Sequence, residues 1–465
     1  MTTDFTIENS AFASLAARFF GWIMRLIRAC AALRILRGSF VFTWLTGHMP
    51  VTAGALTALL FIVPHAQYNN LISLVMMAAL TALLIFGSAA GNCPEIKMPR
   101  IGVYAALFGA AALCAAFLST SFSLSLRFLL FYVTSFLALV LTASILRSRT
   151  DVMRFLTPLL CAVTLSGLYA FYQLATGIRV VRSQVDFAAN AGMSARVYSF
   201  FDNPNNYAEI LVLTLPFFLA FFFLAKTFRG KLFAVIGALP AAAAMVATLS
   251  RSGWMALAAG IALFFLLTYR WVLPIIAVAV VIAIPLLPDV INRRIMTVFN
   301  GQDTSIQYRA KIRLAMMPAI RDYWALGSGL GSDTVLKAVL AHRGGIATVG
   351  FAPHVHQTFL QIWFETGILG VCAFIGTLLT FFKRTLGAVI AVPRAKLAGL
   401  KRLLSVPKGI MLTVAGIAGI TGALIMGFVE YIWFYPRVML MFWLIFGVTV
   451  SAAKAESNEQ LTIDN

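Results

Sequence analysis

Two of the five histidines in this 465-residue chain fall in one apolar segment, HVHQTFLQIWFETGILG, which begins at His354. A neutral imidazole can accept a proton near pH 7, so His356, or its neighbour His354, is a candidate general base. Glu365 lies nine residues after His356, about 13 Å along a helix and on its opposite face. We therefore expect Glu365 to pair with an arginine or a backbone group in the helix bundle, as a supporting residue.

Three arginines precede this segment in short polar motifs. Arg196 lies in SARVYSFFDNPNNYAE, Arg251 in LSRSGWMA and Arg309 in SIQYRAKIRLAMMPAIRDYWAL. Guanidinium groups stay charged and hold phosphates in a fixed, often bidentate fork, so together with an imidazole they suit an anionic lipid substrate and a hydroxyl nucleophile. Taken singly, an arginine at a helix end is more often an anchor that reaches lipid headgroups. Asn203 and Asn205 of the first motif are candidate supporting residues.

The sequence predicts neither a metal nor another cofactor. No D-x-D or H-E-x-x-H motif occurs in the chain. The glycine-rich stretch GSGLGSD, at 327–333, has no Walker lysine and does not follow a predicted strand, so it is neither a P-loop nor a dinucleotide fingerprint. We expect it to form a tight turn that could expose backbone N–H groups. The arginines would then have to stabilise a departing phosphate themselves.

The elements that must position these residues are membrane-spanning helices. Apolar residues make up 61% of the chain and charged residues 11%, and the mean hydropathy is +0.91. A soluble domain is about half apolar and about a quarter charged. Apolar runs long enough to cross a hydrocarbon core of about 30 Å recur along the chain, and in lipid such runs form helices. The alternation of a membrane barrel is absent, so the sequence predicts an all-α integral membrane protein.

We predict about twelve transmembrane helices with both termini in the cytoplasm. The net charge of +20 fits the positive-inside rule better than nucleic-acid binding, because the segment 383–408 alone carries seven Lys and Arg. The large extracytoplasmic loop before the tenth span should contain short helices, one of them kinked or ended by Pro318. The predicted spans are 51–66, 70–88, 101–118, 125–145, 153–175, 206–225, 232–249, 253–268, 271–288, 356–382, 409–429 and 432–451.

This topology divides the chain into five regions and brings the candidate residues to one face of the membrane. In order, the regions are a basic amphipathic segment on the inner leaflet at 1–50, helices one to nine at 51–288, the large extracytoplasmic loop at 289–355, helices ten to twelve at 356–452 and a cytoplasmic tail at 453–465. Because Arg196, Arg251, Arg309 and His356 all fall in outer segments, we expect them to converge there.

Four motifs, in this order, resemble those of the O-antigen ligase and O-antigen polymerase superfamily. They are ARVYSFFDNPN, TLSRSGWMA, IQYRAKIRLAMMPAIRDYWALGSGLG and HVHQTFLQIWFETGILG. The resemblance covers roughly residues 70–450 and implies a bacterial inner-membrane glycosyltransferase that moves a glycan from undecaprenyl pyrophosphate to an acceptor hydroxyl. The acceptor is the lipid A–core oligosaccharide in the ligase branch, another lipid-linked repeat unit in the polymerase branch and a protein in a third branch.

Carried over to this sequence, the resemblance implies that Arg196 and Arg251 hold the donor pyrophosphate, that Arg309 contacts glycan or phosphate and that His356 activates the acceptor. The implied reaction is a metal-independent, inverting displacement on the extracytoplasmic face. Its partners would be the lipid-linked donor, a glycan, lipid or protein acceptor and membrane lipids, without nucleic acid. Two alternatives stay open, a polysaccharide polymerase of the same superfamily and an anionic-lipid transporter, although transporters tend to show internal repeats and charges near the midplane.

Overall fold

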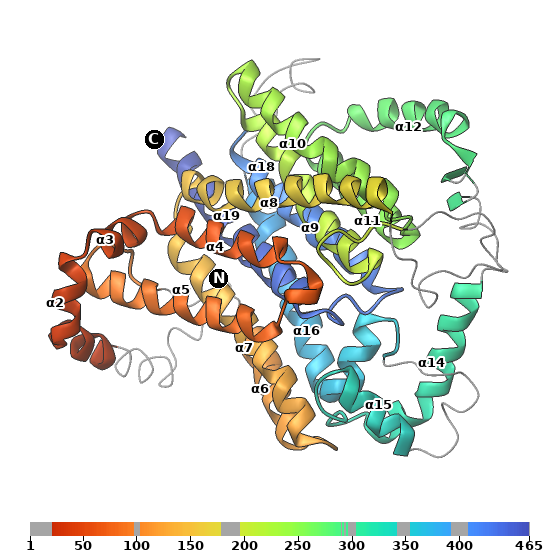
Figure 1. The fold of residues 1–465 in the computed structure, drawn as a ribbon, viewed down its shortest axis with the longest axis horizontal. Helices are drawn as coiled ribbons and strands as arrows, with labels where there is room; N and C mark the ends of the chain where they lie inside the picture. Colours follow the sequence, from red (N-terminus) through yellow and green to blue (C-terminus); the bar gives the residue numbers. More distant parts are fainter. Residues whose placement is uncertain are drawn as a thin grey trace.

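The protein is an assembly of helices in the computed structural model, and no strand occurs among the residues that the structure describes (Figure 1). Residues 1–20 of the predicted basic segment, most of the loop 176–205 and much of the segment 383–408 lie outside those residues. The described ranges are 21–96, 103–177, 196–289, 291–292, 294–295, 304–341, 354–391 and 408–464.

Each predicted span corresponds to one helix. The apolar pattern thus located every one of these elements, although several ends differ by a few residues and the helices of the tenth and twelfth predicted spans extend well beyond their predicted ends. The twelve helices are α4 (Met49–Ile62), α5 (Asn70–Ala90), α6 (Val103–Phe117), α7 (Phe122–Ile145), α8 (Arg149–Thr176), α9 (Pro204–Leu224), α10 (Phe228–Ala247), α11 (Arg251–Leu267), α12 (Val272–Ala283), α16 (Thr358–Ala391), α18 (Met411–Gly427) and α19 (Pro436–Asp464).

Seven helices in the described part of the chain are long and apolar enough to cross a membrane, namely α5, α7, α8, α9, α10, α16 and α19. Helix α3 (Phe40–Gly47) and α4 together form an eighth candidate, bent by 91° between them. Helices α6, α11, α12 and α18 are shorter apolar helices. The chain is therefore an integral membrane protein, while the twelve-span count and the side of each terminus stay predictions.

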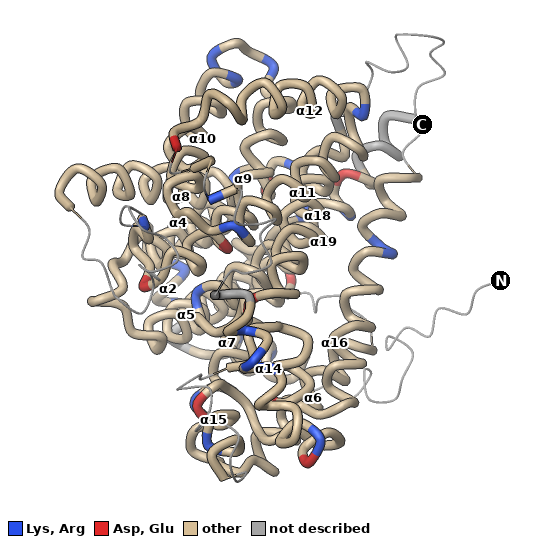
Figure 2. The backbone as a smooth tube through the Cα atoms, turned by 90° about the vertical axis from the view of Figure 1, so that its right-hand side faces the viewer, with Lys and Arg blue, Asp and Glu red and all other residues tan. Residues whose placement is uncertain are grey.

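Helices α9, α18 and α19 form the centre of the bundle. Nearly every side chain of α18 is buried, and this helix packs against α9, α11 and α19. Close approach depends on small residues, since a Cβ added at Gly419 would lie 2.6 Å from the carbonyl oxygen of Leu213. Charged residues are sparse along the backbone (Figure 2). A polar group that faces the interior must therefore find its partner in a mostly apolar bundle.

Two described helices of the long segment between α12 and α16 form a small helical cap beside the bundle (Figure 1). Helix α14 (Thr304–Asp322) and helix α15 (Ser332–Ala341) share an apolar cluster with Val355 and Phe364, at the start of α16. The predicted helix in this segment is confirmed, but Pro318 does not end it, because α14 continues to Asp322. A proline removes one N–H donor and need not stop a helix that is packed on one side.

The glycine-rich turn at 327–333 packs into a break in α16. At Gly367 the backbone has φ 72° and ψ −176°, and the amide of Ile368 donates instead to the carbonyl of Trp324, at 2.8 Å. The N–H of Ser328 donates to the carbonyl of Phe364 at 2.8 Å. The turn is tight, as predicted. The expectation that its amides are exposed was wrong for Ser328, because the N–H of this residue donates to a carbonyl of the broken helix. All three glycines of the turn have positive φ, namely Gly327, Gly329 and Gly331.

Replacing Gly367 with alanine should destabilise the protein by about 2–4 kcal/mol, because the backbone conformation there is almost restricted to glycine. The new Cβ would also lie 2.1 Å from the carbonyl oxygen of Ala325. Gly387→Ala, in the same helix but with open space around it, is the matched control and should change stability by no more than about 1 kcal/mol. Thermal unfolding of both variants in detergent measures the difference. Equal unfolding temperatures would show that the break in α16 is not required.

Candidate functional site

Helix ends that carry the candidate residues meet at one end of the bundle. Arg196 precedes α9, and its Nε donates to the carbonyl of Thr248, just beyond α10, at 2.8 Å. Arg251 is the first residue of α11. His356 lies two residues before α16, and Glu430 lies between α18 and α19. Segments far apart in the sequence therefore supply one polar site in an otherwise apolar bundle.

The carboxylate of Glu430 is the centre of this site. It forms an ion pair with Arg309, whose Nη2 donates to Oε1, and the amide Nδ2 of Asn205 donates to the same oxygen at 2.9 Å. The other oxygen, Oε2, lies 3.4 Å from Nδ1 of His356. Burial opposes ionisation of Glu430, but Arg309 and the histidines outweigh burial and hold the pKa of the carboxyl below its usual range. Glu430 is therefore an anion at neutral pH.

Arg196 joins this centre through Asn205. Its Nη2 donates to the amide oxygen Oδ1 of Asn205 at 2.7 Å, and Asn205 in turn donates to Glu430. Burial, together with the nearby cation Arg294, lowers the pKa of the Arg196 guanidinium to about 9, while Glu430 opposes the shift. Arg309 and Arg251 lower the same pKa. We call Arg196, Arg251, Arg294 and Arg309 the arginine cluster.

The two histidines lie against each other but in different surroundings. Their ring centroids are 4.1 Å apart. His356 exposes 21% of its side chain, and its φ of 54° is unusual for a non-glycine residue. His354 is buried, with its ring 4.4 Å from that of Phe434. Burial and the nearby His356 lower the pKa of His354 to about 3. His356 is therefore the imidazole that a substrate can reach.

A second layer of hydrogen bonds supports the histidine segment. The amide of Val355 donates to Oε1 of Gln361 at 2.9 Å, and Nε2 of Gln361 donates to Oε1 of Glu365 at 2.9 Å. The hydroxyl of Tyr431 donates to the same oxygen of Glu365, also at 2.9 Å. Of the two expected partners, an arginine or a backbone group, Glu365 has a backbone group, at Gly331, in addition to these two side chains. Its carboxyl joins the segment before α16 to the residue that follows Glu430.

Thr358, the first residue of α16, fixes the backbone on both sides of Tyr431. Its hydroxyl donates to the carbonyl of Glu430 at 2.8 Å and accepts from the amide of Ile432 at 3.1 Å. The amide of Glu430 donates to the carbonyl of Met426 at 3.0 Å. The position of Glu430 relative to His356 is thus determined by the backbone and not only by the contact between the two side chains.

The sequence candidates fall into three groups in the structure. Arg309, Asn205 and His356 contact Glu430 directly, and Arg196 contacts it through Asn205. Arg251 belongs to the surrounding cluster, and His354 packs behind His356. Two supporting residues have structural contacts, because Asn203 caps α9 by accepting from the amide of Asn205, at 2.8 Å, and Glu365 lies in the second layer.

Two site residues were missed by the sequence reasoning. Glu430 lies in the two-residue outer loop between the eleventh and twelfth predicted spans, inside the apolar stretch MGFVEYIWFYP. A carboxylate in so apolar a setting is costly unless it is paired, and that signal could have identified it. Arg294 is one of several basic residues in the large loop, and its Nε donates to the carbonyl of Leu249 at 3.2 Å. Nothing in its local sequence distinguishes it.

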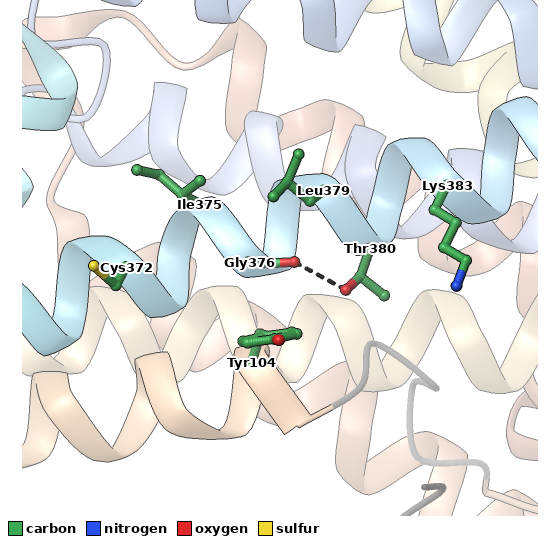
Figure 3. Close-up of a pocket in the computed structure, with 7 residues that line it drawn as sticks. All are labelled: Tyr104, Cys372, Ile375, Gly376, Leu379, Thr380 and Lys383. Atoms are coloured by element: carbon green, nitrogen blue, oxygen red, sulfur yellow. Dashed lines mark hydrogen bonds between the residues drawn. The ribbon is translucent and has the colours of Figure 1, made fainter. Parts of the chain in front are cut away.

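A groove elsewhere on the molecule holds none of these residues. It lies between α6 and α16, has a volume of about 460 Å³ and is shown in Figure 3, where Tyr104 of α6 faces Gly376 of α16 and Lys383 stands at one end. Its α16 residues begin at Cys372, beyond the break at Gly367 and about 24 Å along the chain direction from His356 at helical rise. The groove is therefore separate from the candidate site.

Comparison with known proteins shows a family similarity for part of the chain. A search of curated proteins gives no match. Residues 233–375 match the family model described as O-antigen ligase. This range contains Arg251, Arg294, Arg309 and both clustered histidines, whereas Arg196 and Glu430 lie on either side of it. The site described above is thus built largely from the segment that is similar to the O-antigen ligase family.

Proposed function

We propose that this protein is a glycosyltransferase that moves a glycan from undecaprenyl pyrophosphate to an acceptor hydroxyl, on the extracytoplasmic face of the bacterial inner membrane. The observation that carries the proposal is the grouping of the arginine cluster and one carboxylate beside a reachable imidazole. The family match supports the same class of reaction.

The charge balance of the site favours an anionic ligand. Within the described residues, three other guanidinium groups lie near enough to Arg196 to lower its pKa, and Glu430 forms an ion pair with Arg309. Cations held close together disfavour one another, which adds to burial as a cause of the lowered pKa of Arg196. A pyrophosphate offers several negatively charged oxygens that match guanidinium donors in pairs. The arginine cluster therefore suits the pyrophosphate of a lipid-linked donor.

The hydrogen bond to Glu430 assigns the roles of the two ring nitrogens of His356. An ionised carboxylate only accepts hydrogen bonds, so Nδ1 of His356 must carry its proton toward Oε2 of Glu430. Nε2 is then the unprotonated nitrogen, available to accept a proton from an acceptor hydroxyl. The carboxylate also stabilises the imidazolium that forms when that proton arrives.

The proposed reaction is one displacement at the anomeric carbon of the sugar. The acceptor oxygen forms a bond to this carbon while its proton passes to Nε2 of His356. The bond from the anomeric carbon to the pyrophosphate oxygen breaks, and its electron pair leaves with undecaprenyl pyrophosphate. Because attack and departure occur on opposite sides, the configuration inverts. The arginine cluster stabilises the negative charge that grows on the departing pyrophosphate.

His356→Ala should lower glycan transfer at least about a hundredfold, since general base catalysis contributes about 10²–10⁴ in rate. Purified protein, a lipid-linked glycan donor and an acceptor give the direct measurement, and the amount of protein in the membrane should be unchanged. His48→Ala, at an exposed corner before α4, is the matched control. Full activity of His356→Ala would remove this residue from the mechanism.

Surface glycan from a deletion strain tests the kind of acceptor. Loss of a ligase should leave long lipid-linked chains beside an unmodified acceptor, and gel electrophoresis separates these chains by length. Single repeat units would instead identify a polymerase. Movement of an anionic lipid across liposomes by the purified protein, with no glycan transferred, would contradict both enzymatic functions.

Arg309→Ala should weaken transfer about tenfold to a hundredfold, because a hydrogen bond between charged groups contributes about 1.5–3 kcal/mol. Steady-state kinetics with varied donor concentration should show the loss in kcat/KM for the donor. Arg321→Ala removes an exposed arginine from the same helix and should leave the kinetics unchanged. Equal effects of the two variants would indicate a general dependence on surface charge.

His354→Phe should keep transfer within about tenfold of the original protein and reduce its sensitivity to acid. The folded-state pKa of His354 is about 3, below the ordinary value of about 6.5. Between these values the unfolded chain binds a proton that the folded chain does not, so stability falls as pH falls. At pH 5 this linkage costs about 2 kcal/mol. Thermal unfolding at pH 7 and pH 5 should therefore show a smaller difference for His354→Phe.

A further inference from the structure

We propose that Glu430 is a built-in counter-ion of the donor site and that the donor pyrophosphate displaces it from the arginine cluster. The proposal rests on the function given above and adds a step to it. The carboxylate of Glu430 would occupy the position of an anion while no donor is bound, and it would pass Arg309 to the pyrophosphate when the donor arrives.

The position of the carboxylate is that of a substrate anion. One oxygen, Oε1, accepts from both Arg309 and Asn205, while the other faces His356. Glu430 therefore lies between the groups assigned to the leaving pyrophosphate and the group assigned to the acceptor. Asn205 connects it to Arg196, with the amide oxygen toward the guanidinium and the amide nitrogen toward the carboxylate.

The backbone around Glu430 is fixed, whereas its side chain makes the contacts that an anion could replace. The amide donates to the carbonyl of Met426, and the carbonyl accepts from the hydroxyl of Thr358. Neither bond involves the carboxylate. Replacing Glu430 with glutamine thus leaves these anchors in place and changes chiefly the charge, so the variant is expected to fold.

The exchange would couple donor binding to activation of the base. In the donor-free state the negative charge of Glu430 is shared between Arg309 and His356. When Arg309 turns to the pyrophosphate, His356 is the partner that stays within reach of the carboxylate. A buried carboxylate is costly without a cation, so it would then favour a proton on His356 more strongly. His356 becomes a better base once the leaving group is in place.

This arrangement has an energetic cost that a simple scaffold would not have. A pyrophosphate entering the site must compete with Glu430 for the same donors and must approach a like charge. A carboxylate that merely aligned the arginines would do the opposite, because its removal would let them separate and would weaken anion binding. The sign of the change in affinity therefore separates the two roles of Glu430.

The test measures binding of geranyl pyrophosphate, a short prenyl pyrophosphate, to the purified full-length protein in detergent. Glu430→Gln should bind this probe at least about tenfold more tightly than the original protein, since a competing charge is gone. The same variant should transfer glycan at least about tenfold more slowly at saturating donor, because His356 loses its carboxylate. A lower KM together with a lower kcat is the expected signature.

Matched variants make each outcome decisive. Glu95→Gln makes the same change at an exposed position and should alter neither measurement. Equal or weaker binding of the probe by Glu430→Gln would overturn the counter-ion proposal while leaving the proposed function intact. If the original protein and Arg309→Ala bind the probe equally, the arginine cluster is not a pyrophosphate site and the proposed function itself fails.

Discussion

A carboxylate buried at the end of an apolar helix bundle must be paired, and the site of this protein is arranged around that requirement. Glu430 takes its partners from three other segments: Arg309 from the cap helix α14, Asn205 from the first turn of α9 and His356 from the segment before α16. Each partner alone would offset only part of the cost of burying the charge. Because the buried charge needs all three partners, the side chain of Glu430 connects the cap, α9 and the start of α16.

The backbone around this charge is held as firmly as the charge itself. Thr358 bonds to both sides of Tyr431, and Gln361 and Glu365 connect Tyr431 to Val355, between the two histidines. His356 has a left-handed backbone conformation, which costs on the order of 1–3 kcal/mol for such a residue. The fold can hold this conformation because hydrogen bonds fix the residues on either side of His356, at Val355 and at Thr358. The anchored backbone thus holds His356, a partly exposed imidazole, in this conformation.

The apolar pattern was sufficient to locate every predicted span, because long hydrophobic runs in a membrane protein have few other outcomes. Residue chemistry was sufficient to select Arg196, Arg309 and His356. The hydrogen-bond and ion-pair partners of the site residues were much harder to predict, because they depend on which helix ends come together in the fold. Glu365 was expected to pair with an arginine or a backbone group, and it bonds to the side chains of Gln361 and Tyr431 as well as to the backbone of Gly331, while Glu430 was not considered at all. The break at Gly367 was also missed, since a glycine in an apolar helix indicates close packing as readily as a change of backbone direction.

Arg437 shows, by contrast, how this protein treats an arginine that serves structure alone. Its side chain is fully buried, and it donates to the carbonyls of Leu60, Val63 and Phe200 and to the hydroxyl of Tyr435. Its guanidinium lies over the rings of Tyr68 and Phe201, 4.1 and 4.7 Å from their centroids. Carbonyl dipoles and aromatic faces thus help to satisfy this cation. The arginine cluster is built differently, since three of its members lie near enough to the fourth, Arg196, to disfavour its charge, and Arg309 is paired with Glu430. Such repulsion is costly in a purely structural network, and it fits the proposed binding of a highly charged substrate.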